Sequence, residues 1–360
     1  MITIDSTEYI LLAALTAFLV CIFSIPSIIR VADLKHLYDE PDERKSHTKK
    51  IPTLGGLAMF AGIMIALTLF SASVFAERRF ITCSIIIIFF IGIKDDIIMI
   101  APLKKMIGQI IAVTIVVLFG KIRLTGFYGF MGIGEIHASL SIILSVFTIL
   151  VIMNGFNLID GIDGLAASTG VVISTFFGFW FFLNGHHQEW AMLAFILSAV
   201  LLAFLYYNLT PAKIFMGDTG SLICGLIIGV LTIKFIDLSP VAGRLRFNSV
   251  PIVAFGILIV PLFDTLRVFT LRVFAGKSPL HPDQNHIHHR LLALGLTHLQ
   301  STAIMVSANV TIIGLVYLMQ PNVPALIMLL ILLTLCSFLC YIPSIILKKR
   351  ALKNELTKKQ

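Results

Sequence analysis

Charged residues are scarce in this chain of 360 residues. Asp, Glu, Lys and Arg together make up 13% of it, roughly half the share found in an average soluble domain. Hydrophobic residues make up 58%, and the mean hydropathy is +0.98. So few charges cannot cover the surface of a water-soluble protein of this length. The composition therefore excludes the soluble globular class and indicates an integral membrane protein.

Cysteine pairs, internal repeats and low-complexity linkers are also missing. The five cysteines all fall within apolar runs and show no paired spacing, so neither a disulfide framework nor a zinc motif is predicted. Without a repeat or a linker, residues 1–360 are expected to form a single domain. The net charge of +8 gathers in a few loops and in the tail KKRALKNELTKKQ. This pattern favours the anionic surface of a lipid bilayer as a partner and argues against nucleic acid.

Long apolar runs dominate what is present. Eleven of them approach or exceed the length needed to cross about 30 Å of hydrocarbon. They lie near residues 9–29, 54–73, 80–93, 106–120, 139–153, 165–183, 189–207, 221–236, 249–266, 301–319 and 323–346. We therefore predict an all-α fold, a polytopic transmembrane bundle of about eleven spans. The third, fourth and fifth runs are short, so their helices are expected to borrow length from the flanking residues.

The distribution of Lys and Arg predicts the orientation of the bundle. With the N-terminus outside and the C-terminus in the cytoplasm, the inner loops and the tail hold 20 of the 27 Lys and Arg residues. These inner segments are 30–53, 94–105, 154–164, 208–220, 267–300 and the tail from 347. All the polar motifs described below then fall on the cytoplasmic side. The sequence thus predicts one assembled site on that face.

Two adjacent carboxylates, Asp95 and Asp96, directly follow the third apolar run. Carboxylates are costly near a bilayer, and neighbouring ones repel each other unless a cation or a hydrogen-bond network shares them. The pair suggests a divalent metal or a phosphate-handling centre, or else charges that simply end a helix. Lys105 follows shortly after and could neutralise a substrate phosphate or serve as an interfacial anchor.

The segment NGFNLIDGIDG places polar side chains at every third position, with glycines between them. The polar residues are Asn154, Asn157, Asp160 and Asp163. On a regular helix these four groups would wind around half of the circumference, so the glycines are expected to open a loop in which they converge. Amides and carboxylates there could hold ribose, uracil and sugar hydroxyls. The alternative is a glycine-rich connector without a functional role.

The motif FMGDTGS places Asp218 in a glycine-bounded turn ahead of another apolar run. Such a turn presents backbone N–H groups at a helix N-terminus, where anions bind, and adds one carboxylate suited to Mg²⁺. The alternative, which is compatible with the first, is that Asp218 caps the helix. Phe215 is either a core residue or a flat surface for a nucleobase.

Histidines cluster in the segment HPDQNHIHHR. His286 and His289 share a helical face, whereas His288 points elsewhere. A zinc site, contact with phosphate or sugar, and a solvated surface are the three interpretations. In the ninth apolar run, Asp264 is expected to pair with Arg267 and to act as support.

The first inner loop reads PDERKSHTKKIPTLGG and carries a basic run that ends at Lys50. The basic run could be only a positive-inside anchor. The end of the loop, which includes Thr53, could instead close beside the other polar motifs.

In this order, five segments resemble the motifs of the polyprenyl-phosphate N-acetylhexosamine-1-phosphate transferases, over roughly residues 30–300. The segments are PDERKSHTKKIPTLGG, KDD with PLKKMIGQ, NGFNLIDGIDGL, FMGDTGS and SPLHPDQNHIHHRLL. The HIHHR pattern and the eleventh apolar run are more similar to the WecA and TagO branch of this family than to the related branch of phospho-N-acetylmuramoyl-pentapeptide translocases, such as MraY.

The resemblance implies transfer of a sugar 1-phosphate, GlcNAc-1-phosphate, from a UDP-sugar to undecaprenyl phosphate with release of UMP. This would be the first membrane step of cell-envelope polysaccharide synthesis, in the cytoplasmic membrane of a bacterium, with Mg²⁺ or Mn²⁺ as cofactor. Another UDP-N-acetylated sugar, UDP-MurNAc-pentapeptide as donor, and a homodimer all stay open. A secondary transporter is the alternative of a different class, but its sites tend to lie at the bilayer midplane between inverted repeats, and no repeat is visible here.

The resemblance also implies residue roles. Asp218 would be the metal ligand and, with Asp95 and Asp96, would act at the reacting phosphates. The residues expected to bind substrate are Lys105, Asn157, Asp160, Asp163, Phe215, His286, His288, His289, Thr53 and Lys50. We favour direct attack of the lipid phosphate, with double displacement through an aspartyl-phosphate as the alternative. His281 departs from many relatives, which carry a small or acidic residue there, so sugar preference could differ.

Overall fold

The structure is a computed structural model that describes residues 6–38, 51–70, 77–127, 132–185, 188–274, 276 and 286–358. Helices make up nearly all of the regular structure, and these residues contain no β-strand. The helices are, in order, α1 (Ser6–Lys35), α2 (Gly55–Phe70), α3 (Arg78–Ile97), α4 (Pro102–Leu118), α5 (Ala138–Leu158), α6 (Leu165–Asn184), α7 (Gln188–Asn208), α8 (Gly217–Leu238), the short 3-10 helix η2 (Ser239–Val241), α9 (Val250–Ile257), α10 (Ile259–Phe274), α11 (Ile287–Ala293), α12 (His298–Met319) and α13 (Ala325–Lys358). The predicted all-α fold is confirmed.

Every predicted apolar run coincides with one or two helices over most of its described residues. The first eight correspond to α1 through α8, the ninth to α9 and α10 together, and the last two to α12 and α13. Helix α3 reaches 20 residues and α5 reaches 21 by extending into their polar flanks, as the shortness of their apolar runs predicted. Within the described residues, seven helices are long and apolar enough to cross a membrane, and α9 with α10 makes an eighth if the pair is one span. The number of eleven spans and the orientation stay predictions.

Helix α8 is the centre of the bundle. In its most apolar 18-residue window, 89% of the residues are buried, compared with 22% for both α1 and α13. Helices α2, α3, α5, α6 and α7 all pack against it. A helix that is hydrophobic on every side belongs in the interior of a bundle. Asp218, in the first turn of α8, therefore lies on the central helix of the bundle.

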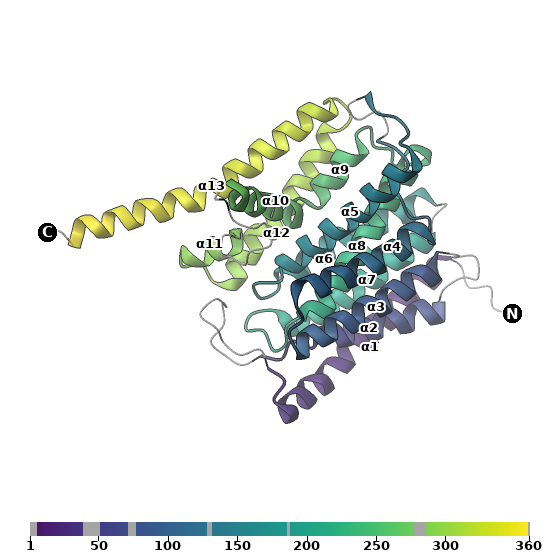
Figure 1. The fold of residues 1–360 in the computed structure, drawn as a ribbon, viewed down its shortest axis with the longest axis horizontal. Coiled ribbons are helices and arrows are strands. Elements are labelled where there is room, and N and C mark those ends of the chain that lie inside the picture. Colours follow the sequence, from purple (N-terminus) through teal and green to yellow (C-terminus); the bar gives the residue numbers. More distant parts are fainter. Residues whose placement is uncertain are drawn as a thin grey trace.

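The last five helices form a group along one side of α5, α6 and α8. Figure 1 shows α1 beginning on the right of the view and α13 ending far to the left, with α9 through α13 gathered beside the other helices. Contacts between α10 and α5, between α12 and α6 and between α9 and α8 join the two groups. This arrangement brings the histidine-bearing helix α11 to the same end of the bundle as the C-terminus of α5.

A sharp break separates α9 from α10, which are bent by 86°. Pro261 lies in the first turn of α10 and lacks the N–H that would bond to the carbonyl of Ile257 in a continuous helix. Asn309 of α12 takes over this role, because its Nδ2 donates to the Ile257 oxygen at 3.1 Å. The break is therefore stabilised by a side chain from a neighbouring helix, and it sets the direction in which α10 presents Asp264.

Candidate active site

Four helix ends meet around one lysine. Asp95 lies in the last turn of α3, Lys105 in the first turn of α4, Asn157 in the last turn of α5 and Asp218 in the first turn of α8. Lys105 Nζ donates to Asp95 Oδ2 at 3.0 Å and also to Asp218 Oδ2. Asn157 Nδ2 donates to Asp218 Oδ1 at 2.6 Å and to Ser221 Oγ at 2.7 Å. Residues more than a hundred positions apart in the chain thus form one connected cluster, which we call the lysine–carboxylate cluster.

Asp96 contacts this cluster by capping the N-terminus of α8. Its Oδ1 accepts a hydrogen bond from Asp218 N at 2.7 Å, and its Oδ2 accepts from Thr219 N at 3.0 Å and Thr219 Oγ1 at 2.5 Å. The carboxylate packs closely against Gly217, where φ is +69° and an added Cβ would lie 2.7 Å from both Asp96 oxygens. Both oxygens of Asp96 are therefore occupied. The geometry favours a positioning role, in which Asp96 orients Asp218, over the predicted direct contact with a phosphate.

Asp160 lies in the turn between α5 and α6 and faces the same cluster. Burial, together with the negative charges of Asp218 and Asp96, raises the pKa of Asp160 to about 7. The carboxylates of Asp95, Asp96, Asp160 and Asp218 therefore lie close together, and Lys105 is the basic residue of the cluster. Such an excess of negative charge is relieved when another cation binds or when a proton is taken up.

The expected convergence of all four polar groups in NGFNLIDGIDG is only half right. Asn154 lies within α5 instead of a loop, and its Nδ2 donates to Gln109 Oε1 at 2.9 Å. Asp163 turns the other way, because its Oδ1 lies 3.1 Å from His298 Nδ1 and its Oδ2 accepts from Ala212 N at 3.2 Å. Helix α5 continues to Leu158, so Asn154 and Asn157 point in different directions from the helix, whereas Asp163 lies beyond its end. Asp163 is thereby placed as an anchor for the start of α12 and not with the lysine–carboxylate cluster.

The end of the first inner loop lies beside the start of α8. Phe215 N donates to Pro52 O at 2.8 Å, and Gly55 N donates back to Phe215 O at 2.9 Å. The carbonyl oxygen of Thr53 lies so close to Gly217 that an added Cβ would be 2.2 Å from it. Thr53 and the half-buried Phe215 therefore border the cluster, as the sequence predicted for this part of the loop. Lys50 lies outside the described residues, and so does His281.

The histidine segment reaches the site through His288. An added Cβ on Gly161, next to Asp160, would lie 2.4 Å from His288 Nε2. His288 is 1% exposed, and its Nδ1 has no hydrogen-bond partner among the described residues. Burial, together with the neighbouring His289, lowers the pKa of His288 to about 3, so this imidazole is neutral. A neutral imidazole next to the Asp160 turn can donate or accept a hydrogen bond to a sugar or a phosphate.

His286 is engaged elsewhere, which departs from its predicted contact with substrate. Its Nδ1 lies 2.9 Å from Asp264 Oδ2, while Asp264 Oδ1 accepts from Ile287 N at 3.1 Å and from Arg267 Nη2 at 3.2 Å. Asp264 is completely buried. The predicted pairing of Asp264 with Arg267 is present, and His286 is a second partner that the sequence did not indicate. The three residues hold the start of α11, so His288 can point to Gly161. His289 is half-buried, with its ring centroid 4.3 Å from that of His288.

Asn208 is a linking residue that the sequence analysis missed. It is 3% exposed, its Oδ1 accepts from Gly164 N at 2.9 Å, and its Nδ2 donates to Ile214 O at 2.8 Å. It thereby connects the end of NGFNLIDGIDG to the segment that leads into FMGDTGS. A lone amide at the end of the apolar run of α7 was the available signal, because an amide at that depth needs partners.

The donor chemistry of the cluster fits a divalent cation that substrate phosphates complete. Mg²⁺ usually binds one or two protein carboxylates together with waters and phosphates. Asp95 and Asp218 each already direct one oxygen at the Lys105 ammonium. Among the residues that the structure describes, no three His, Cys, Asp or Glu side chains are arranged to hold a metal ion by themselves. The residues present therefore fit a magnesium site that is shared with substrate better than a closed structural metal site.

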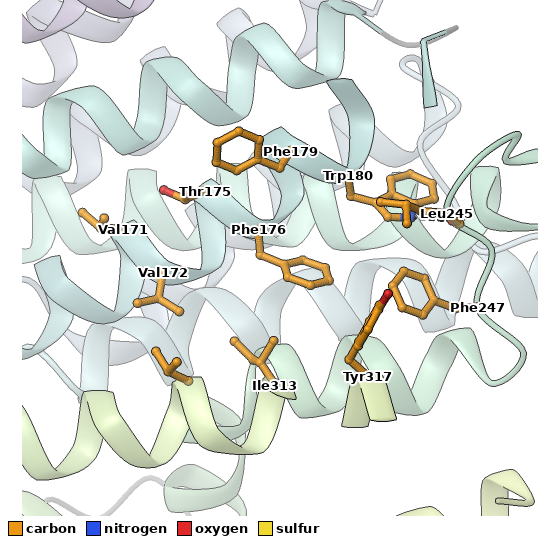
Figure 2. A pocket seen from close by; sticks show the side chains of 11 residues that line it. Val171, Val172, Thr175, Phe176, Phe179, Trp180, Leu245, Phe247, Ile313 and Tyr317 are labelled. Atoms are coloured by element: carbon orange, nitrogen blue, oxygen red, sulfur yellow. Dashed lines mark hydrogen bonds between the residues drawn. The ribbon is translucent and has the colours of Figure 1, made fainter. Parts of the chain in front are cut away.

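A separate hollow between α6 and α12 has a different character (Figure 2). It has a volume of about 450 Å³, and its lining includes Phe176, Phe179 and Trp180 of α6 and Tyr317 of α12. Trp180 Nε1 is bonded to Leu245 O at 3.0 Å. The described residues of the lining include no charged side chain, so they cannot compensate the charge of a phosphate. This hollow suits hydrocarbon, and it does not belong to the candidate active site.

Comparison with known proteins places the chain among transferases. Residues 78–236 match the sequence model of glycosyl transferase family 4. The chain is 34% identical over 301 residues to the probable undecaprenyl-phosphate N-acetylglucosaminyl 1-phosphate transferase of Bacillus subtilis, covering 82% of this chain and 81% of that relative. It is 32% identical over 286 residues to the decaprenyl-phosphate N-acetylglucosaminephosphotransferase of Mycolicibacterium smegmatis, covering 72% and 69% of the two chains.

A third relative comes from Escherichia coli K12. Its name is undecaprenyl-phosphate alpha-N-acetylglucosaminyl 1-phosphate transferase, and it is 29% identical over 319 residues, which cover 87% of this chain and 84% of the relative. These similarities extend over most of both chains, and they agree with the motif resemblance found in the sequence. The chain therefore belongs to glycosyl transferase family 4.

Proposed function

We propose that this protein transfers N-acetylglucosamine 1-phosphate from UDP-N-acetylglucosamine to undecaprenyl phosphate and releases UMP. The observation that carries the proposal is the lysine–carboxylate cluster of Asp95, Lys105, Asn157 and Asp218, with Asp160 beside it, at one end of a membrane-type helical bundle. Three bacterial relatives are named for this transfer with undecaprenyl or decaprenyl phosphate. Sugar-1-phosphate transfer to a polyprenyl phosphate is the part of the proposal on which these relatives agree.

The proposed reaction is a direct displacement at phosphorus. An oxygen of the lipid phosphate forms a bond to the β-phosphorus of the donor. The bond between that phosphorus and the oxygen that bridges to the α-phosphate breaks, and this oxygen leaves as part of UMP. The second pKa of a phosphate monoester is about 6, so the attacking group is largely dianionic at neutral pH and needs no strong base. The larger difficulty is the approach of two anions, which a cation held between them relieves.

The side chains around the cluster support this displacement. Lys105 supplies a positive charge beside Asp95 and Asp218. Asp95 accepts hydrogen bonds from Ile100 N at 2.6 Å and from Lys105 Nζ at 3.0 Å, so it is held to orient the acceptor or to take a residual proton. Both oxygens of Asp95 and of Asp218 accept such bonds, which favours a supporting role over nucleophilic attack and formation of an aspartyl-phosphate.

Mg²⁺, with Mn²⁺ as a substitute, is the proposed cofactor. Asp218 would hold it, with Asp95 or Asp160 nearest for a second carboxylate. When bound, the ion supplies positive charge that stabilises the pyrophosphate and the departing UMP. Asn157 holds the Asp218 side chain through its 2.6 Å hydrogen bond, and Asp96 accepts a hydrogen bond from the Asp218 backbone N–H.

The remaining site residues divide between donor binding and support. Asn157, Asp160 and Phe215 are proposed to lie about the nucleotide, and His288 is proposed to contact the sugar or the pyrophosphate. Asp163 and His286 are proposed to act indirectly, because their side chains are engaged with His298 and Asp264. The site is proposed to face the cytoplasm in the cytoplasmic membrane of a bacterium.

A transfer assay on the purified protein tests the proposal. Protein in lipid nanodiscs would be incubated with undecaprenyl phosphate, a divalent cation and a panel of labelled donors: UDP-N-acetylglucosamine, UDP-N-acetylgalactosamine and UDP-MurNAc-pentapeptide. A lipid-linked product together with UMP from UDP-N-acetylglucosamine is the expected result, and it should require Mg²⁺ or Mn²⁺. Product from another donor alone would replace the donor assignment. Absence of both product and UMP with every donor would contradict the proposed reaction.

A further inference from the structure

We propose that α10, α11 and the middle of α13 form a binding site for an anionic phospholipid. The site consists of a basic pocket and an adjoining apolar cavity, and neither contains a residue of the lysine–carboxylate cluster. The proposal goes beyond the transferase reaction and does not depend on which sugar is transferred.

The basic pocket has a volume of about 500 Å³, and its charged lining residues are Arg267, Arg290 and Lys348. They come from three different helices, α10, α11 and α13. The hydroxyl-bearing residues Ser344 and Tyr341 also line it, and Arg290 Nη1 donates to Ser344 Oγ. The described lining includes no carboxylate. Basic pockets between helices at the cytoplasmic end of a membrane bundle bind the phosphates of anionic lipid headgroups.

The apolar cavity lies next to the basic pocket, on the side of the bundle interior. It has a volume of about 360 Å³ and lies between α10, α11, α12 and α13. Apart from Asp264, whose carboxylate is already satisfied, its lining is apolar and includes Phe263, Leu291 and Leu339. Cys340 lines both the pocket and the cavity, so the two spaces are neighbours at this residue. A charged outer part joined to an apolar inner part matches the amphipathic shape of a phospholipid, with its phosphate outside and the start of an acyl chain inside.

The residues that line the pocket argue for a phospholipid and against the lipid acceptor of the reaction. An acceptor phosphate has to reach the lysine–carboxylate cluster, whereas no residue of that cluster is among the described residues that line the basic pocket. Among the described lining residues, the charged side chains that a phosphodiester in this pocket would meet are all basic. A lipid bound there would also join α13 to α11, and α11 carries His288, which packs on Gly161.

Lipid retention measured by native mass spectrometry tests the proposal without depending on transferase activity. The full-length protein would be equilibrated with equal amounts of phosphatidylglycerol and phosphatidylcholine of the same acyl chains and then released from mild detergent. The wild type is expected to retain phosphatidylglycerol preferentially. Lys348→Gln should reduce that retention about fivefold, since each basic side chain near an anionic headgroup contributes about 1 kcal/mol. Lys349→Gln is the matched control, because Lys349 is its exposed neighbour on α13 and lines neither space, and it should leave retention unchanged.

A second variant tests the apolar part with the charges intact. Cys340→Phe would fill the junction between pocket and cavity and should also reduce phosphatidylglycerol retention, with its thermal midpoint in phosphatidylcholine serving as a check on folding. Equal losses in Lys348→Gln and Lys349→Gln would overturn the proposal, because they would mean general attraction to the surface. Undiminished retention in a folded Cys340→Phe would overturn the acyl-chain cavity. Displacement of phosphatidylglycerol by equimolar undecaprenyl phosphate in the wild type, but not in Lys348→Gln, would overturn the choice of occupant.

Discussion

Two groups of charged side chains lie at the same end of the bundle, and they differ in exposure and in charge balance. In the lysine–carboxylate cluster, the Asp218 side chain is 26% exposed and that of Lys105 is 18% exposed, and carboxylates outnumber the lysine. In the group around Asp264, the carboxylate is 0% exposed and has two basic partners, Arg267 and His286. A buried carboxylate whose oxygens are all satisfied supports the fold. A partly exposed cluster with surplus negative charge has capacity left for a cation and a phosphorylated substrate.

Replacing Asp218 by Asn should show the largest difference between the two groups, because it should lower activity without lowering stability. Transfer is expected to fall by about 10²–10³-fold, the scale on which loss of one preorganised electrostatic group lowers an enzyme's turnover. Stability should hold or rise, because the change removes a negative charge from a cluster that has too many. Initial rates and thermal midpoints in nanodiscs measure the two effects.

The matched control for this variant is Asp237→Asn, at the other end of α8, where Asp237 Oδ1 accepts from Thr125 Oγ1 at 2.7 Å. The control should keep its activity. A near-normal rate for Asp218→Asn, or an equal loss in Asp237→Asn, would remove Asp218 from the reaction centre.

Replacing Asp264 by Asn should produce the opposite profile. The amide can still accept from Ile287 N, but it no longer balances Arg267 and His286, so unfolding is expected to become easier by about 2 kcal/mol. The rate per folded molecule should fall less than in Asp218→Asn, through misplacement of His288. Thermal midpoints with and without donor, together with initial rates, check this prediction. If Asp264→Asn kept wild-type stability and lost all activity, the supporting role assigned to Asp264 would be wrong.

Replacing Gly161 by Ala should disturb the contact between the histidine segment and the Asp160 turn. The added Cβ would lie 2.4 Å from His288 Nε2, so the imidazole has to move, and overpacking of this kind costs about 1–3 kcal/mol. We expect the donor KM to rise about tenfold. Gly314→Ala is the control, since a Cβ there meets nothing within 4 Å. An unchanged KM in Gly161→Ala would place His288 outside the donor site.

The pH dependence of stability should report the crowding of carboxylates. The pKa of Asp160 is raised from 3.8 to about 7 in the folded protein. Between these values the folded form binds a proton that the unfolded form does not, so this group's contribution to wild-type stability falls as the pH rises toward 7. The Asp160→Asn variant lacks this pH-dependent contribution to stability. Its thermal midpoint relative to wild type, measured with a chelator present, should therefore increase between about pH 5 and about pH 8, and a constant difference would contradict the raised pKa.

The members of the lysine–carboxylate cluster were predictable from where polar residues interrupt apolar runs. Asp95, Lys105, Asn157 and Asp218 each follow or precede such a run, and a carboxylate at that depth needs a partner. Which partner each one takes was not predictable. Asp160 and Asp163 belong to the same motif, yet only Asp160 faces the cluster, because the residues after Leu158 leave the helix and their backbone angles decide which way each side chain points.

The histidines show the same division between pattern and geometry. The spacing in HIHHR places His286 and His289 on one face of a helix, but His286 precedes α11, and Asp264, 22 residues earlier in the chain, takes its Nδ1. His288 is then left to pack on Gly161. A periodicity argument describes one helix in isolation, whereas these contacts depend on how α10, α11 and the end of α5 are placed against one another.

The amino-acid sequence by itself determined that the chain forms apolar helices, because backbone polar groups in hydrocarbon have to be satisfied within each segment. The order of its polar motifs also determined the family. Only the tertiary structure decided that Asp218 meets Lys105 and Asn157, that Asp96 caps α8, and that Asp264 holds the histidine segment. The physical reason is that these hydrogen bonds act over about 3 Å, and distances of that size between residues remote in the chain are set by the packing of whole helices.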